Sequence, residues 1–420
     1  MSHQMLGTMD PQGRWFTTFD TVARWAAVSL VASALMSRAL FNLSAFVLLV
    51  GLVLSGHYAT RWAQIRRHPL TLPIGLLIGL IVFGALYSPA SPAQVIDHWE
   101  RYSKFALVLL MIPLLSEDRW RQRAWMGFVL AGLLTLGSTY ANIWWDVPWS
   151  RTQGHGWGVD HSVFANHIAQ GLVMTFFCAY CVVSALHTRR RGLKVAWLLA
   201  AVLAAVSVTH LSIGRTGMAA LGFVVTLVLL YELPAKWRWI GVAGAVVVIA
   251  LLMASSSVLR MRFETVIQEI QAYQNTVDYT SSGARLHMWQ VSWDLWWQSP
   301  LWGHGTGSYH DLVKVAFADE IMCIIGCFHP HNQWLFFAVE HGLLGVAALG
   351  FLLWRLARVG CRPRHAESGL VVAYLATFLV DSMVHGPLWI HMEAYFFFSM
   401  LALIGARLSP LAEVTAPQRP

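Results

Sequence analysis

The stretch His329-Pro330-His331-Asn332-Gln333-Trp334-Leu335 separates the longest polar segment of the chain from an apolar block. Residues 256–330 before it are rich in charged and polar side chains, whereas residues 331–354 after it are mostly apolar. We therefore predict that an aqueous loop meets a membrane at this point. Histidines at a membrane boundary need a local reason, because ionisable side chains are costly there.

The composition is that of a membrane protein rather than a soluble one. Of the 420 residues, 57% are hydrophobic and only 12% are charged, whereas soluble domains carry about 25% charged residues. The apolar residues form long blocks, each near the ~20 residues that cross ~30 Å of hydrocarbon. We predict an all-α polytopic membrane protein with about twelve spans, at approximately 17–36, 39–57, 69–89, 103–116, 122–142, 161–186, 193–211, 214–232, 238–255, 331–354, 367–385 and 388–407.

The basic residues predict the orientation of these spans. With a cytoplasmic N-terminus, 20 of the 29 Lys and Arg lie in cytoplasmic breaks or ends, as the positive-inside rule requires. Spans one to nine then occupy residues 1–255, a helical outer loop fills 256–330, and spans ten to twelve with a short cytoplasmic tail fill 331–420. The cations that lie outside, against this bias, are Arg38, Arg101, Lys104, Arg151, Arg215, Arg260, Arg262, Arg285 and Lys314.

The net charge of +8 is explained by the cytoplasmic breaks. A basic protein can bind nucleic acid, but the sequence carries no nucleic-acid-binding motif. We therefore expect membrane lipids, and not nucleic acid, as partners.

The turn Ser212-Ile-Gly-Arg215-Thr-Gly217 precedes the eighth span on the outer side. The first turn of a helix offers unpaired N–H groups and a positive dipole, and an arginine adds a bidentate donor. Gly214 allows a ligand to approach the backbone closely. We predict that Arg215 and Gly214 bind a phosphate or diphosphate, and the structural alternative is an interfacial arginine that reaches for water.

Two further outer arginines are candidate ligand-binding residues. Arg285 follows Ser281-Ser282-Gly283, which is typical of a helix start, and Trp289 on the same helix can lie on the membrane surface. Spacing alone fits a solvated helix charge equally well. Arg151 lies in the Trp- and Gly-rich outer segment 143–160 and is expected to contribute to substrate binding.

His331 is the candidate general base. The imidazole group titrates near neutrality and can take a proton from a hydroxyl. His329 lies beside it, and Asn332 is placed to orient a substrate. A structural or helix-capping histidine is the alternative interpretation, but the expected approach of several arginines to the same membrane face favours a catalytic role.

Asp381 and His385 are four residues apart and are predicted to share one helix face near the outer end of the eleventh span. An aspartate within a membrane is costly and is more often functional than not. We expect Asp381 to orient His331 or an arginine, and His385 to contribute to substrate binding. A structural ion pair with an arginine is the alternative.

No metal site is predicted, because the other outer histidines lack the usual ligand spacing. Cys323 and Cys327 are both predicted to lie outside, where disulfides persist if the compartment is oxidising. Their spacing leaves a bond between them open.

Several of these residues fit a known pattern. The pair His331-Asn332 is followed, after nine residues, by Gly342-Leu-Leu-Gly345. With the Arg215 turn and the segment Thr280-Ser-Ser-Gly-Ala-Arg285, the chain resembles the bacterial O-antigen ligase family, which is grouped with O-antigen polymerases and O-linked protein oligosaccharyltransferases. The resemblance is most specific over residues 205–345.

The resemblance implies a glycosyltransferase of the GT-C membrane type, in the bacterial inner membrane with a periplasmic active site and no cofactor. The donor would be an O-antigen glycan on undecaprenyl diphosphate, and the acceptor a sugar hydroxyl of lipid A–core. Arg215 and Arg285 would bind the diphosphate in place of a metal ion, and His331 would deprotonate the acceptor. The product would have inverted configuration.

Other functions fit parts of the same pattern. An O-antigen polymerase would use the same donor and a lipid-linked acceptor, and a protein O-oligosaccharyltransferase would use a protein acceptor. A lipid or glycan transporter would place polar residues at the bilayer midplane in matching halves, whereas here they gather at one face without a repeat.

Overall fold

The structure is a computed structural model that describes residues 11–272, 280–317, 323, 326–361 and 367–408. All the regular secondary structure in these residues is helical. The helices are α1 (Pro11–Ser33), α2 (Arg38–Leu54), α3 (Tyr58–Arg67), α4 (Thr71–Gly84), α5 (Pro92–Tyr102), α6 (Lys104–Leu115), α7 (Asp118–Ala141), α8 (His167–His187), α9 (Arg191–His210), α10 (Arg215–Glu232), α11 (Ala235–Ser255), α12 (Ser257–Ala272), α13 (Ser281–Gln298), α14 (Tyr309–Ala316), α16 (Gln333–Gly360), α17 (Ser368–Val384) and α18 (His391–Ala406).

Each predicted span coincides with one of these helices. Among the described residues, six are long and apolar enough to cross a membrane, namely α7, α8, α9, α10, α11 and α16. The bent pair α2 and α3 meets the same requirement together, and α4, α17 and α18 are shorter apolar helices. The all-α polytopic membrane fold is therefore confirmed, and the number of twelve spans stays a prediction.

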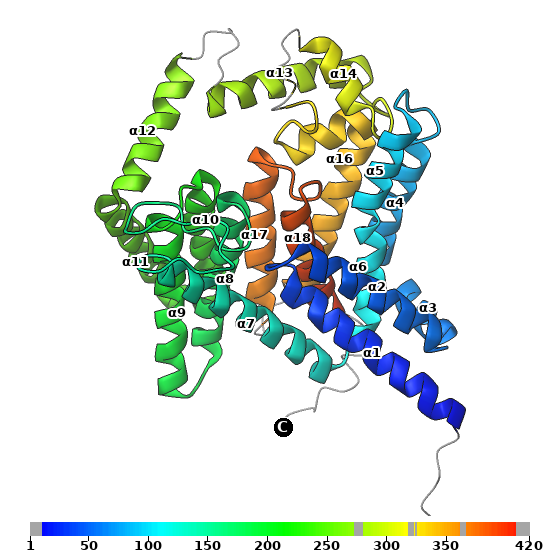
Figure 1. The fold of residues 1–420 in the computed structure, drawn as a ribbon, viewed down its shortest axis with the longest axis horizontal. Coiled ribbons are helices and arrows are strands. Elements are labelled where there is room, and N and C mark those ends of the chain that lie inside the picture. Colours follow the sequence, from blue (N-terminus) through cyan, green and yellow to red (C-terminus); the bar gives the residue numbers. More distant parts are fainter. Residues whose placement is uncertain (1–10, 273–279, 318–322, 324–325, 362–366, 409–420) are drawn as a thin grey trace, which may run out of the picture.

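Helix α17 joins two parts of the bundle (Figure 1). On one side it packs against α8 and α10, and on the other against α16 and α18. Helix α18 is buried along its whole length from Glu393 to Ala406, as expected for a helix that is apolar all round. These contacts position the outer ends of α10, α16, α17 and α18 near one another.

The predicted outer loop forms helices at one end of the bundle (Figure 1). The described residues of the segment 256–330, which was predicted to be helical, contain α12, α13 and α14. The Thr280 side chain caps α13 by accepting a hydrogen bond from the Gly283 amide at 3.1 Å, so the predicted helix start is confirmed. A disulfide joins Cys323 to Cys327.

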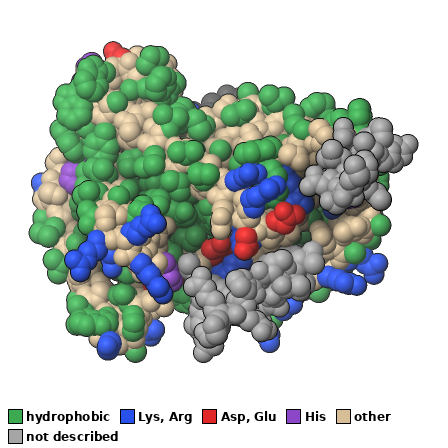
Figure 2. All heavy atoms as spheres, turned by 90° about the horizontal axis from the view of Figure 1, so that it is seen from below, with side chains coloured by type: hydrophobic (Ala, Val, Ile, Leu, Met, Phe, Trp, Pro, Cys, Tyr) green, Lys and Arg blue, Asp and Glu red, His purple; other side chains and the backbone are tan. Residues whose placement is uncertain are grey.

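Lys and Arg side chains gather in several groups on the face at the opposite end from α13 (Figure 2). Helix α3 ends in Arg66 and Arg67, and α7 begins with Asp118 followed by three arginines within six residues. The uneven distribution agrees with the orientation predicted from the positive-inside rule. The orientation itself stays a prediction.

Helix α16 is broken at Gly342, where φ is 62° and ψ is −158°. This conformation is open only to glycine. The main chain of residues 300–307 lies against the break, and the Gly305 amide donates to the Glu340 carbonyl at 2.8 Å. A Cβ atom on Gly342 would lie 2.3 Å from the Leu301 backbone. Both the torsion angles and the contact with the loop therefore require glycine.

We expect Gly342→Ala to destabilise the protein strongly, because it adds backbone strain of about 1–3 kcal/mol to a main-chain collision. The matched control is Gly350→Ala on the same helix, where an added Cβ meets nothing within 4 Å. That change should be neutral or stabilise by about 0.5–1 kcal/mol. Thermal unfolding midpoints in detergent measure both, and equal midpoints for the two variants would contradict this account of the break.

Candidate active site

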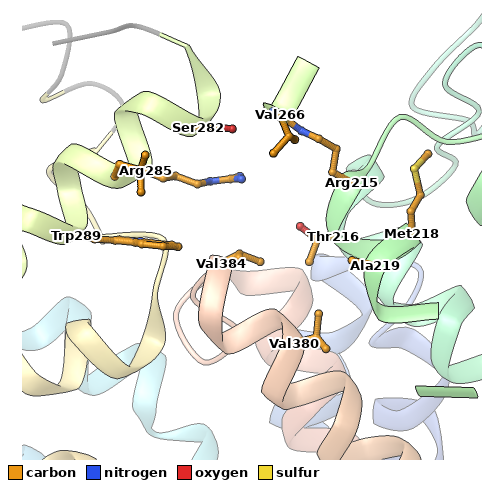
Figure 3. Close-up of a pocket in the computed structure, with 11 residues that line it drawn as sticks. Arg215, Thr216, Met218, Ala219, Val266, Ser282, Arg285, Trp289, Val380 and Val384 are labelled. Atoms are coloured by element: carbon orange, nitrogen blue, oxygen red, sulfur yellow. The ribbon is translucent and has the colours of Figure 1, made fainter. Parts of the chain in front are cut away.

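A cavity of about 330 Å³ opens between α10, α12, α13 and α17 (Figure 3). Arg215 extends into it from the first position of α10, and Arg285 from the fifth position of α13 on the opposite wall (Figure 3). The remaining walls are largely apolar and are formed by Thr216, Met218, Ala219, Val266, Ser282, Leu286, Trp289, Val380 and Val384. The predicted approach of the two arginines is thus present in the structure, with an apolar space between them.

Glu269 of α12 connects the two walls of this cavity, because it contacts both α10 and α13. Its Oε2 atom lies 3.2 Å from Nη1 of Arg215 and accepts a hydrogen bond from the Ser282 amide at 3.1 Å. Burial tends to raise the pKa of this carboxyl group, but the hydrogen bonds from Ser282 and Arg215 outweigh burial and lower it. Glu269 was not identified from the sequence, because the pairing joins residues 54 positions apart without a local pattern.

Arg285 is in a more restrictive environment than Arg215. Burial lowers the pKa of its guanidinium, and the charge of Arg215 lowers it further, whereas Glu269 and Asp381 act in the opposite direction. The two guanidinium groups therefore line the same cavity and repel each other electrostatically. An anion between them would relieve that repulsion and accept several charge-assisted hydrogen bonds.

The glycine before Arg215 has a packing role. Gly214 is the N-cap of α10, and a Cβ atom there would lie 2.7 Å from the carbonyl oxygen of His167. Close contact with the start of α8 therefore explains this glycine. Its predicted contact with a ligand stays a prediction.

The turn that carries His331 is tightly fixed. His331 has a φ of 49°, an uncommon conformation for a residue with a side chain. Its amide donates to Nδ1 of His329 at 3.1 Å, and the indole N–H of Trp289 donates to the Pro330 carbonyl at 3.0 Å. Trp289 was expected on the membrane surface, but it is half-buried and connects α13 to this turn.

Asn332 caps α16. Its Oδ1 atom accepts hydrogen bonds from the amides of Trp334 and Leu335, both at 3.0 Å. Its Nδ2 atom donates to the Met383 carbonyl on α17 at 3.1 Å. The side chain therefore fixes the start of α16 next to His331, and its predicted contact with substrate stays a prediction.

His385, which directly follows α17, lies beside the two histidines of this turn. The ring of His385 lies 5.2 Å from that of His331 and 5.9 Å from that of His329, measured between centroids. Its Nδ1 atom is 2.6 Å from Oε2 of Glu393 and 3.9 Å from Oδ1 of Asp381. Asp381 therefore lies next to His385, with which it was predicted to share a helix face, and its charge also acts on Arg285. Its role in orienting His331 or an arginine stays a prediction. Glu393, on α18, was not identified from the sequence.

Asp381, His385 and Glu393 form a buried group of side chains that could act as metal ligands. The three side chains are buried and their ligand atoms lie within 4.8 Å of one another. Two atoms bound to one zinc ion at ~2.0–2.1 Å in a tetrahedral site are roughly 3.3 Å apart, whereas His385 and Glu393 are 2.6 Å apart. The distance of 2.6 Å is that of a hydrogen bond, so His385 and Glu393 are paired with each other in this structure.

The cavity lies next to the His331 turn, because residues that line it also contact or adjoin residues of the turn. Trp289 lines the cavity and holds Pro330 through its indole N–H. Val384 lines the cavity and precedes His385. A ligand anchored between the arginines would therefore extend toward His331. Arg151 is not part of this arrangement, since its side chain is exposed in the loop before α8 and does not line the cavity.

We expect Trp289→Phe to loosen the His331 turn, because it removes one hydrogen bond worth about 0.5–1.5 kcal/mol and keeps an aromatic ring. Amide hydrogen exchange at residues 331–333 should rise roughly two- to tenfold. The control is Trp293→Phe, on the exposed side of the same helix, which should leave exchange there unchanged. Equal exchange in the two variants would argue against this hydrogen bond.

A pH dependence follows from His329. Burial first, and then the charges of His331, His385, Arg101 and Arg285, lower the pKa of His329 well below its usual value. Below about pH 6.5 the unfolded chain binds a proton that the folded chain does not, so stability falls as the pH falls.

His329→Asn should reduce this loss, because the amide oxygen can still accept from the His331 amide while no proton is bound. The difference between variant and wild type is at most about 1.4 kcal/mol per pH unit. Thermal unfolding midpoints between pH 7.5 and 5.5 measure it. Parallel curves for the two proteins would show that His329 is not the group responsible.

Residues 199–350 match the O-antigen ligase family. The matched range contains α10, α12, α13, the His331 turn and the break at Gly342. The chain is also similar to an uncharacterised protein of Haemophilus influenzae, with 27% identity over 194 residues, which are 44% of this chain and 48% of that protein. The chain therefore spans about half the length of this relative.

Proposed function

We propose that this chain is an O-antigen ligase, and the match of residues 199–350 to the O-antigen ligase family supports the proposal. It transfers a glycan from undecaprenyl diphosphate to a sugar hydroxyl of lipid A–core, at the periplasmic face of the bacterial inner membrane. The observation that carries this proposal is the apolar cavity with Arg215 and Arg285 on opposite walls, next to the His331 turn.

The donor has the same chemical character as this cavity. The diphosphate lies between Arg215 and Arg285, where two guanidinium groups offer bidentate hydrogen bonds. The apolar walls from Val380, Val384 and Met218 suit a polyprenyl chain. The opening of the cavity between helices lets such a chain remain in the membrane.

His331 acts as the general base in this proposal. Its imidazole takes the proton of the acceptor hydroxyl as the oxygen attacks the anomeric carbon of the donor. The bond from that carbon to the diphosphate breaks on the opposite side, so the configuration inverts. Arg215 and Arg285 stabilise the negative charge that develops on the leaving diphosphate, which is the task a divalent cation performs in many other glycosyltransferases.

The decisive experiment is transfer by the purified protein in detergent with a chelator, from an undecaprenyl diphosphate glycan to lipopolysaccharide that lacks O-antigen. We expect product as a shift in gel mobility. His331→Ala should reduce the rate by about 10²–10⁴, the usual contribution of a general base. The control is His155→Gln, an exposed histidine in the loop before α8, which should transfer at the wild-type rate.

The other outcomes are also informative. Lengthening of the lipid-linked glycan, without a product on lipopolysaccharide, would assign the chain to the polymerases of the same superfamily. Full activity in folded His331→Ala would exclude His331 as the base. Loss of activity on addition of the chelator would exclude the arginine pair as the sole stabiliser of the leaving group.

A further inference from the structure

A second group of basic residues lies at the outer end of the bundle. Three helices begin there with a basic residue, namely α2 with Arg38, α6 with Lys104 and α18 with His391. A cation at a helix N-terminus is opposed by the helix dipole. Arg38 and Lys104 also lie on the predicted outer side against the positive-inside bias. Both the helix dipole and the positive-inside bias therefore disfavour cations at this place. An anion bound here would compensate for both effects.

The side chain of Tyr395 brings these helix starts together. Its ring stacks on Phe41 of α2 at a centroid distance of 3.9 Å, and its hydroxyl lies 3.3 Å from Oδ1 of Asn42. The ammonium group of Lys104 lies 5.5 Å from the centre of the same ring. Helices α2 and α6 both pack against α18 (Figure 1), so the arrangement is part of the folded core.

Arg101, the penultimate residue of α5, completes the outer basic cluster of Arg38, Arg101 and Lys104. Arg101 stacks on Trp389 with its guanidinium carbon 4.1 Å from the ring centre and pairs with Asp97 at 2.8 Å. The charges of all three cluster members act on the ring of His391. The cluster therefore behaves as one site rather than as separate surface charges.

The positive charge of the cluster exceeds its protein counter-charges. Asp97 pairs with Arg101, and Glu100 is exposed nearby. The ammonium group of Lys104 donates to the main-chain oxygens of Glu100 and Arg101, at 3.4 and 3.0 Å, although the residue is only 9% exposed. The direct partners of this buried ammonium group are main-chain oxygens and not carboxylates, although the charges of Glu100 and Asp97 act on it. Burying a charge that is not paired directly is costly, so the site favours a negatively charged ligand.

The cluster lies on a different side of the His331 turn from the arginine cavity. Arg101 contacts Trp389, whose ring packs 5.2 Å from that of Phe336 in the first turn of α16. Arg101 and Arg285 both act electrostatically on His329. His329, two residues before the proposed base, is therefore influenced by cations of both sites, of which the proposed donor occupies one.

We propose that Arg38, Arg101 and Lys104 bind the phosphate groups of a membrane-anchored acceptor glycolipid, while Arg215 and Arg285 hold the donor. This inference rests on the function proposed above, since it assigns the second site to the second substrate. A transferase that joins two anionic amphiphiles must hold both at one base. Phosphate on the acceptor anchor fixes its depth in the membrane and directs its sugar hydroxyl toward His331.

Binding tests this without relying on transfer. The protein in detergent is titrated with diphosphoryl lipid A, monophosphoryl lipid A and phosphatidylglycerol. Wild-type protein should bind the diphosphoryl form about tenfold more tightly than either of the others, because one charge-assisted contact is worth roughly that factor. Arg38→Gln, a change at an exposed side chain that should preserve folding, should reduce this preference to near unity. Lys314→Gln, at an exposed position of α14, should retain it.

Transfer kinetics distinguish failure of this inference from failure of the proposed function. If lipid A–core is the acceptor, Arg38→Gln should raise the acceptor KM about tenfold and leave kcat and the donor KM unchanged. An unchanged acceptor KM in an active enzyme would overturn the phosphate site and leave the ligase proposal intact. Phosphatidylglycerol that binds as tightly as diphosphoryl lipid A would overturn the acceptor assignment in favour of a general phospholipid site. Phosphate-dependent binding without any transfer would support the site and contradict the ligase.

Discussion

The first part of α16, from Gln333 to His341, ends at a cap on one side and at a helix break on the other. The backbone groups at both ends need hydrogen-bond partners, and the residues that supply these partners also shape the site. At its start, Asn332 accepts from two amides of the first turn. At the break, the main chain of residues 300–307 supplies the missing donors, as Gly305 does for Glu340. Irregular backbone at this depth is tolerated only where protein covers it. The helical piece between these two points, residues 333–341, is roughly 14 Å long. The spacing of nine residues between Asn332 and Gly342 is thus the length of one capped helical segment, with His331 fixed directly before it.

The second constraint is electrostatic. In the predicted orientation most basic residues lie on the cytoplasmic side, so the exceptions need local compensation. Arg215 and Arg285 meet around the cavity and share Glu269. Arg38, Arg101 and Lys104 meet around Tyr395 and Trp389. Five of the nine exceptions are therefore collected at two places, each with more cations than carboxylates among the residues that contact them.

Sequence patterns predicted the local features well, and the long-range ones poorly. The apolar blocks predicted a helix at every span, and Ser282-Gly283 predicted the start of α13, because periodicity and capping are local. The approach of Arg215 to Arg285 was predicted only through topology. Glu269 and Glu393 were missed, since a carboxylate that pairs with a partner dozens of residues away, or across a helix break, leaves no spacing signal. Asp381 and His385 were predicted as neighbours on a helix, but α17 ends at Val384 and His385 is in extended conformation. The two side chains still meet, through the turn that leads to α18 rather than through helical spacing.

The position of the histidines follows from these same two constraints. A general base has to be neutral before it accepts a proton, and cations nearby favour the neutral imidazole. His329 is held in that form by burial and by the surrounding positive charge, so it can accept the His331 amide hydrogen bond that fixes the turn. The carboxylate of Glu393 is hydrogen-bonded to His385 and not to His329. The cations that would hold two anionic lipids thus also keep the supporting histidine in the protonation state that the turn requires. The same cations thus serve two purposes: they would bind the two anionic substrates, and they help to keep His329 neutral so that the turn carrying His331 stays fixed.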